Sequence, residues 1–478
     1  MSYDTNLYRI GFYFTRETEH NVDIEISNSE IIIKNYTPDF SKKLNELLSY
    51  TDKSKEYQIR KMSRNPFSRA SDHYKKLVAS QHGTMVDERS GVIAVPSGFA
   101  YLFKNDHYLD KRKDTGKQVA FPWKTKPYEL RDYQFEANTL ICDNYRGLIN
   151  FATGLGKTLT AVYAIRSIGR RTLVLCPTQS IADNFYQELC EAFGDDRVGY
   201  FGGGKKQLKD ITVGIAASVN NHIEKFAKHE LGLVIIDEVH HVPADTFFTI
   251  AKTLSAVGRM FGLTATDFRS DGKDVMIQAG VGEVLIKRDI VWGIENKWLA
   301  YPNIIMRDVE TTGREYPEDK NKNYKAHVLN SQEMNSRLIS DIQKCLDAGK
   351  FVLCLVDEKA HGQMLSEALG LPFATGDDKQ SLEYVKQLNA GSIQGLIGTD
   401  SKVGEGTDTK NVDVLVLANF VASKGPLWQN LGRGLRRQGT KKTVLVLDYK
   451  PTGSKMLSRH ADQRLKLYKA ITSSVREV

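Results

Sequence analysis

The sequence has few cysteines and no long apolar run, and each absence excludes a class of protein. Its five cysteines form no CxxC pair and have no histidine at metal-ligand spacing; they are Cys142, Cys176, Cys190, Cys345 and Cys354. This pattern excludes a zinc finger or a disulfide-stapled module and predicts free, buried thiols. No run of about 18 apolar residues occurs and the first residues lack a signal-peptide pattern, so we expect a reduced, cytoplasmic protein with no membrane partner.

The sequence also lacks internal repeats, low-complexity tracts and a strong overall charge. With 478 residues, 41% of them hydrophobic, it is long enough for about three folded domains. The net charge of +8 is unevenly distributed: residues 1–52 carry −4, residues 53–126 carry +9 and residues 424–478 carry +10. Two separate basic segments predict extended contacts with a polyanion.

Apolar runs alternate with amphipathic stretches through most of the chain, which predicts α/β architecture with two doubly wound parallel-sheet lobes. The expected strands are 148–151, 172–176, 213–216, 233–237, 261–263, 351–356, 395–398, 412–417 and 443–447. Weaker periodicity separates the lobes, and we expect residues 311–325 to form an exposed loop.

The beginning of the chain predicts a small accessory domain of α+β type. Strands are expected at 22–26, 30–33 and 91–94, a helix at 40–48 and a loop at 111–117. The predicted domains are therefore a basic accessory domain (1–126), a first lobe (127–299) and a second lobe (300–478) that ends in a basic helix.

A glycine-rich segment, Phe151-Ala-Thr-Gly-Leu-Gly-Lys-Thr158, lies between a predicted strand and a predicted helix. Gly154 and Gly156, with Thr153 before them, let backbone N–H groups turn toward a phosphate, while Lys157 supplies positive charge. Thr158 can bind Mg²⁺ through its hydroxyl. The segment predicts a phosphate-binding loop, with a plain strand-to-helix turn as the alternative.

Two adjacent carboxylates, Asp237 and Glu238, follow the apolar strand at 233–237. The carboxyl ends of parallel strands form the ligand-binding edge of such a sheet. We predict that Asp237 holds Mg²⁺ and that Glu238 orients and deprotonates the water that attacks the γ-phosphate of a nucleotide. Solvated strand caps are the alternative interpretation.

Asp-Glu-Val-His at 237–240 resembles the DExH box of superfamily 2 helicases, and other motifs of that family follow in order. Leu130-Arg-Asp-Tyr-Gln134 resembles the Q-motif, which implies that Gln134 reads the adenine edge and that Arg131 or a nearby aromatic ring flanks the base. Cys176-Pro-Thr178 and Ala216-Ala-Ser218 resemble motifs Ia and Ib, which implies nucleic-acid backbone contacts by Pro177, Thr178 and Ser218. Thr264-Ala-Thr266 resembles motif III, which couples the γ-phosphate to the nucleic-acid site.

The second predicted lobe carries the remaining motifs. Gly398-Thr399 with Gly404-Glu-Gly-Thr-Asp408 resembles motif V, which implies that Thr399 contacts the nucleic acid and that Gly406 and Asp408 face the nucleotide. Gln429-Asn-Leu-Gly-Arg-Gly-Leu-Arg436 resembles motif VI, which implies that Gln429, Arg433 and Arg436 act on the γ-phosphate. The spacing of three residues predicts that one helix face carries both arginines.

The resemblance covers residues 127–450 and implies two RecA-like lobes, ATP and Mg²⁺ as cofactors, and nucleic-acid-dependent ATP hydrolysis. Within the family, the DExH box and the small basic N-terminal domain resemble phage UvsW-type helicases. This implies a monomer, in bacterial or phage-infected cytoplasm, that unwinds or branch-migrates forked and junction DNA in recombination, repair or replication-fork processing. The alternatives are a translocase or annealing motor, an RNA-dependent ATPase, and a non-enzymatic binding protein.

A further hypothesis concerns Lys111, Arg112 and Lys113 in the basic segment 53–126. Aromatic residues lie nearby in the sequence: Tyr101, Phe103, Tyr108 and Trp123. Basic side chains neutralise phosphates and aromatic rings stack on unpaired bases, so these residues predict an arm that binds duplex or branched DNA. A solvated basic face with core aromatics is the alternative.

Overall fold

The computed structural model describes residues 22–63, 68–69, 71–103, 108–240, 242, 244–265, 273–317, 319–375, 380–399, 409, 411–421, 424–437 and 441–478. The chain divides into two compact units. The first unit comprises residues 1–150 and 157–287, and the second comprises residues 151–156 and 288–478.

The first unit contains an eight-stranded sheet in the order β11-β10-β12-β9-β13-β14-β8-β15, and its central strands are parallel. The strands are β8 (Arg146–Phe151), β9 (Thr172–Cys176), β10 (Val198–Gly202), β11 (Lys205–Lys206), β12 (Ile211–Ile215), β13 (Leu233–Ile236), β14 (Arg259–Thr264) and β15 (Val284–Arg288). The five strands predicted for this region are confirmed. The sequence analysis missed β10, β11 and β15. In β10, two glycines dilute the pattern of β-formers.

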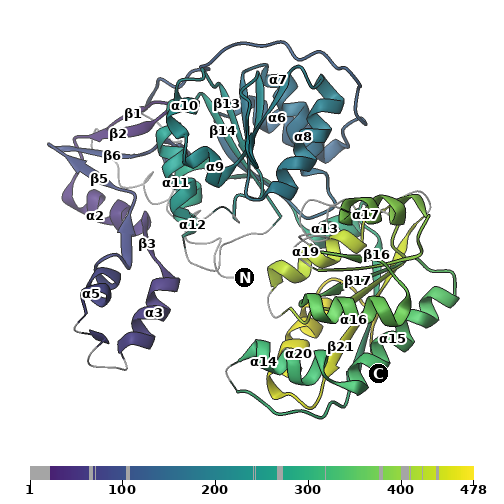
Figure 1. The fold of residues 1–478 in the computed structure, drawn as a ribbon. Helices are drawn as coiled ribbons and strands as arrows, with labels where there is room; N and C mark the ends of the chain where they lie inside the picture. The colour runs from purple at the N-terminus through teal and green to yellow at the C-terminus, as the bar shows by residue number, and fades with distance from the viewer. Residues whose placement is uncertain are drawn as a thin grey trace. The chain divides into compact units, whose positions relative to one another are not determined.

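Helices cover both faces of this sheet (Figure 1). They are α6 (Asp132–Asp143), α7 (Lys157–Ile168), α8 (Gln179–Phe193), α9 (Ala216–Asn220), α10 (Ile223–Ala227), α11 (Ala244–Thr253) and α12 (Asp274–Val281). One buried cluster joins the strands to α9, α10, α11 and α12 through residues such as Val219, Phe247 and Ile277. Helices α6, α7 and α8 pack together on the opposite face.

The accessory part of the first unit is a five-stranded sheet in the order β5-β6-β2-β1-β7. Its elements are β1 (Asp23–Ile26), β2 (Glu30–Lys34), α2 (Pro38–Leu47), β5 (Asp87–Arg89), β6 (Val92–Pro96), the 3₁₀ helix η1 (Ser97–Phe103) and β7 (Tyr108–Asp110). The predicted helix is confirmed, and Thr37 caps its N-terminus by accepting a hydrogen bond from the Phe40 N–H. The predicted loop at 111–117 and the three predicted strands are also confirmed.

The accessory sheet shares its core with helix α12 of the eight-stranded sheet. Met276 and Ala279 of α12 belong to the same buried cluster as Ile31, Ile93 and Phe99. The buried Arg146 guanidinium donates hydrogen bonds to three backbone oxygens, including that of Asn28 in the accessory sheet. The accessory part is therefore fixed to the first lobe by both apolar and polar contacts.

The second unit contains a seven-stranded sheet in the order β18-β19-β17-β20-β21-β16-β22, with parallel pairing throughout. The strands are β16 (Tyr301–Val309), β17 (Val352–Val356), β18 (Phe373–Ala374), β19 (Gly395–Thr399), β20 (Val414–Ala418), β21 (Thr443–Pro451) and β22 (Val475–Glu477). The helices include α13 (Ile290–Glu295), α14 (Lys320–Tyr324), α15 (Gln332–Asp347), α16 (Lys359–Leu369), α17 (Ser381–Ala390), α19 (Lys424–Gly434) and α20 (Lys455–Lys469). The four strands predicted here are confirmed, whereas β16, β18 and β22 were not predicted.

One prediction for the second unit is wrong. Residues 311–325 were expected to be an exposed loop, yet they include α14, in which Asn323 and Tyr324 are buried. The Asn323 amide pairs with both backbone groups of Tyr316, and the Tyr324 hydroxyl lies 2.7 Å from Nδ1 of His361. His361 lies 37 positions from Tyr324 in the sequence, and Asn323 meets Tyr316 only when the segment turns back on itself, so local polarity gave no sign of either contact.

The fold class is confirmed: two RecA-like, doubly wound parallel-sheet lobes with a small α+β accessory part. No helix among the described residues is long and apolar enough to cross a bilayer. The three-domain division with boundaries at 126 and 299 stays a prediction.

Candidate functional site

The glycine-rich segment forms the turn between β8 and α7, as the sequence predicts. Gly154 and Gly156 adopt φ values of +90° and +79°, which favour glycine because a Cβ would be strained there. Helix α7 begins at Lys157, so its N-terminal N–H groups and Lys157 share one end of the helix, and Thr158 is its second residue. A helix N-terminus after a glycine turn is suited to bind a phosphate.

The two carboxylates lie directly after β13, at the carboxyl edge of the sheet. The Asp237 N–H donates to the Leu175 carbonyl (2.8 Å) and the Val239 N–H donates to the Leu263 carbonyl (3.1 Å), which fixes this turn between its neighbouring strands. Glu238 adopts φ +42°, a left-handed conformation that costs a non-glycine residue free energy. Surrounding contacts therefore hold Glu238 in a strained position.

An ion pair joins the phosphate loop to the carboxylates. Nζ of Lys157 lies 3.0 Å from Oε1 of Glu238, and the two side chains are only 10% and 16% exposed. Such shielding strengthens the attraction between the two charges relative to a surface pair. The two residues predicted to bind the phosphate and activate water are thus in direct contact.

Glu238 is also connected to the next strand through His240. Nδ1 of His240 lies 3.5 Å from the other Glu238 oxygen and 2.8 Å from the Thr264 hydroxyl. Thr264 is the last residue of β14 and belongs to the predicted motif III, whose Thr266 lies outside the described residues. The sequence analysis gave Thr264 a coupling role as part of motif III, through the resemblance, but assigned no role to His240.

Asp237 has the chemistry of a cation ligand. Its Oδ1 is buried without a hydrogen-bond partner among the residues that the structure describes. Burial and then the negative charge of Glu238 raise the pKa of Asp237 to about 7. A divalent cation would stabilise the ionised carboxylate, so Asp237 fits the predicted Mg²⁺ site, with the Thr158 hydroxyl as the second proposed ligand.

In the described part of the chain, no three His, Cys, Asp or Glu side chains are grouped as a metal cage. Mg²⁺ in phosphate-transfer sites takes one or two protein ligands and completes its shell with water and phosphate oxygens. The single buried carboxylate is therefore compatible with Mg²⁺ and does not suggest a zinc-type site.

The predicted Q-motif forms the start of α6. Oε1 of Gln134 accepts a hydrogen bond from the Arg131 N–H (3.0 Å), and the Arg131 guanidinium donates to the Tyr133 hydroxyl (3.0 Å). Gln134 is buried, whereas Tyr128, three residues before Arg131, is 88% exposed. Tyr128 is therefore an available aromatic ring beside this motif.

The predicted nucleic-acid contacts of the first lobe lie at the same sheet edge as Asp237. Pro177 and Thr178 follow β9, and Ser218 lies in α9 directly after β12; β12, β9 and β13 are adjacent parallel strands. The Thr178 hydroxyl also caps α8 by accepting a hydrogen bond from the Ile181 N–H.

The second unit places its predicted residues differently from the expectation. Helix α19 ends at Gly434, and the backbone of Arg436 instead forms a β-bridge with Leu299. The prediction that one helix face carries both arginines is therefore wrong, because Gly432 and Gly434 weaken the last turn. Arg433 is buried and donates to Oδ1 of Asn430 (2.8 Å), with Gln429 on the same helix.

Thr399, at the end of β19, is buried, and its hydroxyl has no hydrogen-bond partner among the described residues. The predicted nucleotide contacts Gly406 and Asp408 lie outside the described residues.

The basic residues 111–113 are partly engaged within the protein. Lys111 forms an ion pair with Glu25 (2.8 Å) and Arg112 with Asp110 (2.6 Å), and the Arg112 guanidinium lies over the Tyr145 ring. Two of the nearby aromatics have structural roles: Phe103 is buried, and Trp123 stacks on Phe193 at 5.1 Å.

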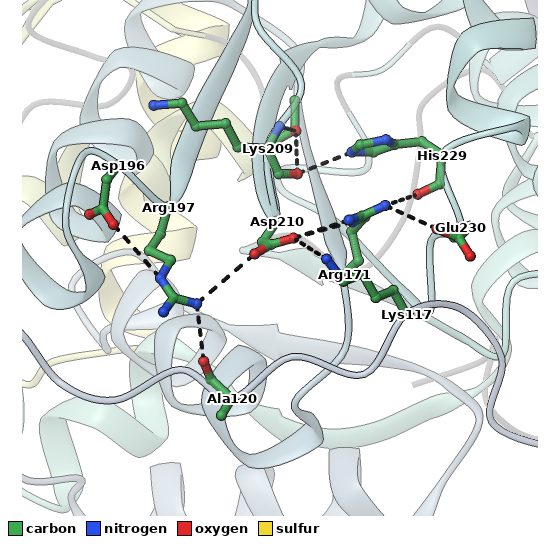
Figure 2. A network of polar contacts seen from close by, with 10 residues as sticks. Lys117, Ala120, Arg171, Asp196, Arg197, Lys209, Asp210, His229 and Glu230 are labelled. Atoms are coloured by element: carbon green, nitrogen blue, oxygen red, sulfur yellow. Dashed lines mark hydrogen bonds and ion pairs between the residues drawn. The ribbon is translucent and has the colours of Figure 1, made fainter.

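Residues 111–124, which we call the strap, are bound to the first lobe at the opposite edge of the sheet. Figure 2 shows the network around Asp210, whose carboxylate contacts Lys117 (3.7 Å), Arg171 (3.2 Å) and Arg197 (4.0 Å). Backbone hydrogen bonds from Lys117 to Glu230 and from Arg171 to Lys117 extend this attachment. The network is a structural attachment, distant from the carboxylates of β13.

The chain is similar to known helicases in sequence. Residues 127–269 match a family model described as type III restriction enzyme, res subunit. Rad25 of Halobacterium salinarum, named as a DNA 3'-5' helicase, is 28% identical over 333 residues, which are 67% of this chain and 54% of that protein. The DNA 3'-5' translocase XPB2 of Sulfurisphaera tokodaii is 25% identical over 408 residues, covering 76% of this chain and 92% of that protein. The chain thus spans about half of the first relative and nearly all of the second.

Solved structures show the same fold. Dbp5 of S. cerevisiae, bound to RNA and ADP BeF3, aligns with 72% of this chain and 88% of its own at 13% identity and a TM-score of 0.52. T4 UvsW aligns with 96% of this chain and 99% of its own at 16% identity and a TM-score of 0.45. This score gives no support to the finer UvsW-type prediction. The UvsW type and the DExH subgroup therefore stay predictions. The sequence similarities, together with the Lys157–Glu238–Asp237 site, support a helicase of superfamily 2.

Proposed function

We propose that this chain is an ATP-dependent DNA helicase or translocase. The observation that carries the proposal is the shielded ion pair between Lys157 and Glu238 beside the buried carboxylate of Asp237. These groups have the chemistry needed to bind a phosphate, hold a cation and activate water at one sheet edge.

In this proposal, a nucleotide phosphate displaces Glu238 as the partner of Lys157. Glu238 is then available to orient a water molecule and accept its proton, while Lys157 neutralises the phosphate charge. Mg²⁺ held by Asp237 and Thr158 would supply further positive charge to the phosphate oxygens. Gln134 and Arg131 contribute to adenine binding, with Tyr128 as the proposed flanking ring. Arg433 and Arg436, with Gln429, are proposed to stabilise charge on the transferred phosphoryl group.

The contacts from Glu238 through His240 to Thr264 provide a route for coupling. When Glu238 exchanges Lys157 for water, the position of His240 and hence its contact with Thr264 should change. We propose that this change is transmitted from the nucleotide to the nucleic-acid-binding edge, where Pro177, Thr178 and Ser218 lie, and that Thr399 contributes from the second lobe.

DNA is the proposed polyanion because the two relatives described above are named as acting on DNA. Branched DNA, a role in recombination or repair, and a monomeric state are finer parts of the same proposal. ATP hydrolysis measured with single-stranded DNA, forks, four-way junctions, blunt duplex and RNA tests it. Stimulation by DNA with strand displacement or branch migration is expected; stimulation by RNA alone would contradict the DNA assignment.

A further inference from the structure

The accessory part of the first unit carries a helical arm that is separate from its sheet. Helices α3 (Lys53–Ser63) and α5 (Asp72–Ala79) lie between β3 (Ser49–Thr51) and β4 (His82–Thr84), which pair as a two-stranded ribbon. We call residues 53–81 the arm. Figure 1 shows α3 and α5 standing away from the five-stranded sheet, with β3 at their base.

The two helices of the arm have few fully buried side chains. None of the side chains of α3 is buried, and Leu77 is the only buried side chain of α5. A helix pair with so little core contributes little to folding through burial. Its exposed faces are therefore open to a role in binding.

The arm is strongly basic, and much of its charge is uncompensated. It contains eight Lys and Arg residues and two acidic residues. The two acidic residues each pair on their own helix, Glu56 with Arg60 (2.9 Å) and Asp72 with Lys75 (3.8 Å). Four exposed cations have no acidic partner among the described residues: Lys53, Lys61, Arg69 and Lys76.

One face of α3 combines charge with an aromatic ring. Lys53, Tyr57 and Lys61 are spaced four residues apart, so they lie along the same side of the helix. Tyr57 is 71% exposed. The three side chains span about 12 Å along the axis, a length that covers three to four phosphates of one DNA strand at about 3.4 Å each.

The base of the arm is attached to the first lobe by buried polar contacts. Asp52, which is buried, accepts hydrogen bonds from the N–H groups of Ser54 and Lys55 at the start of α3 and pairs with Lys273 at 2.9 Å. Burial acts to raise the pKa of Asp52, but the hydrogen bonds from Ser54 and Lys273 outweigh it and lower the pKa to about 2. Lys273 directly precedes α12, which packs on the accessory core. A buried ion pair therefore links the base of the arm to the first lobe.

We infer that the arm is a binding surface for the phosphate backbone of duplex DNA next to a branch point. Lys53, Lys61, Arg69 and Lys76 contact phosphates, and Tyr57 stacks on an unpaired base at the branch. This inference rests on the proposed DNA motor function, and it assigns DNA binding to the arm in place of the engaged residues Lys111 and Arg112.

The test uses the full chain with four substitutions: Lys53→Gln, Lys61→Gln, Arg69→Gln and Lys76→Gln. A matched control replaces four exposed lysines elsewhere on the first unit: Lys34, Lys42, Lys228 and Lys252, each by Gln. Binding to a fluorescent DNA fork is measured without nucleotide across a salt series. The arm variant should bind at least about tenfold more weakly, and its slope of log affinity against log salt should fall by about 3 to 4, because each lost phosphate contact removes about 0.9.

The control variant should keep the slope of the wild-type protein. Tyr57→Ala should weaken binding to the fork but not to blunt duplex, because only the fork offers an unpaired base. An unchanged slope in the arm variant, or a loss seen only with duplex RNA, would overturn the inference. ATP hydrolysis at saturating single-stranded DNA separates the two proposals. The arm variant should keep the hydrolysis rate of the wild-type protein. If the wild-type protein hydrolysed no ATP, the motor function would be contradicted, while the fork-binding result would still test the arm.

Discussion

The two lobes have the same sheet plan, but their equivalent strand ends carry different chemistry. In each lobe a central strand, β13 or β20, is followed by two residues of which the second has positive φ: Glu238 at +42° and Phe420 at +44°. The first lobe places Asp237 and Glu238 there, whereas the second places Asn419 and Phe420. Phe420 is buried in the apolar core beside Tyr324, while Glu238 pairs with Lys157.

The shared fold thus supplies a strained turn at the same place in each lobe, and the residues at that turn decide its chemistry. The loop after β8 contains Gly154, Gly156 and Lys157, but the segment after β16, the equivalent strand by sheet order, has no such pattern. Phosphate chemistry is therefore expected from the first lobe's strand ends and not from their equivalents in the second.

The largest expected effect comes from removing the first lobe's charged pair. Lys157→Ala should lose most nucleotide affinity, because the phosphate charge is left uncompensated. Glu238→Gln should keep ATP binding while hydrolysis falls by about 100-fold or more, the usual contribution of a catalytic base. Nucleotide titration and steady-state ATPase assays check both. The exposed Glu224→Gln is the matched control, and near-normal turnover in Glu238→Gln would refute its assignment as the base.

A somewhat smaller effect is expected from the second lobe's arginines. Arg433→Ala and Arg436→Ala should each lower ATP hydrolysis by roughly 10- to 1000-fold with DNA affinity retained, because a positioned guanidinium stabilises transition-state charge. ATPase and DNA-binding assays on the same samples check this, with the exposed Arg459→Ala as the control.

Arg433→Lys tests whether charge or shape matters, because the buried guanidinium also bonds Asn430. If either alanine variant kept full ATPase and lost DNA binding, that arginine would belong to the nucleic-acid surface.

The attachment of the accessory part to the first lobe predicts a stability change. Because the pKa of Asp52 is lowered to about 2, its ionised form stabilises the fold above pH 3.8, and this stabilisation is lost as the pH falls through about 2. Asp52→Asn should reduce the free energy of unfolding by about 2 kcal/mol at pH 7, since each pKa unit corresponds to about 1.4 kcal/mol.

Chemical denaturation at pH 7 and pH 3 measures this difference, which should shrink at the lower pH. Lys273→Met should destabilise the same unit by leaving Asp52 buried without its cation. Equal losses at both pH values would mean that Asp52 acts through shape and not through charge.

The cation site also predicts a change in thermal stability. Burial raises the pKa of Asp237 to about 7, so its ionised form destabilises the fold, and this cost grows as the pH rises from 3.8 through 7. Without Mg²⁺, Asp237→Asn should therefore raise the melting temperature at pH 8 by at least about 2 °C and have less effect at pH 5. Thermal unfolding with and without Mg²⁺-nucleotide checks this.

The equivalent position in the other lobe offers a matched substitution. Asn419→Asp introduces a carboxylate at a fully buried position and should lower the melting temperature without adding ATPase activity.

The Asp237→Asn variant also tests the cation site directly. If this variant bound Mg²⁺-nucleotide as tightly as the wild-type protein, Asp237 would not be the cation ligand.

Nine strands of the two lobes, the glycine loop and the position of Asp237 and Glu238 after β13 could be predicted from the sequence alone, whereas strands such as β10, β15 and β16 could not. These features are local: apolar runs report buried strands, and glycines at positive φ report a turn. Parallel topology then brings Pro177 and Ser218 to the same sheet edge, because neighbouring parallel strands end together.

Which charged groups are in contact depends on the packing of segments that are distant in the sequence. The pair of Asp52 and Lys273 joins residues more than two hundred positions apart, and the contact between His240 and Thr264 joins two strand ends. The same holds for the strap, where Lys111 and Arg112 find acidic partners, and for Arg436, which leaves its helix to bridge Leu299. Local sequence patterns indicate periodicity and turns, whereas these contacts depend on how distant segments pack. For the same reason, the exposed cations of the arm could be identified only in the folded chain.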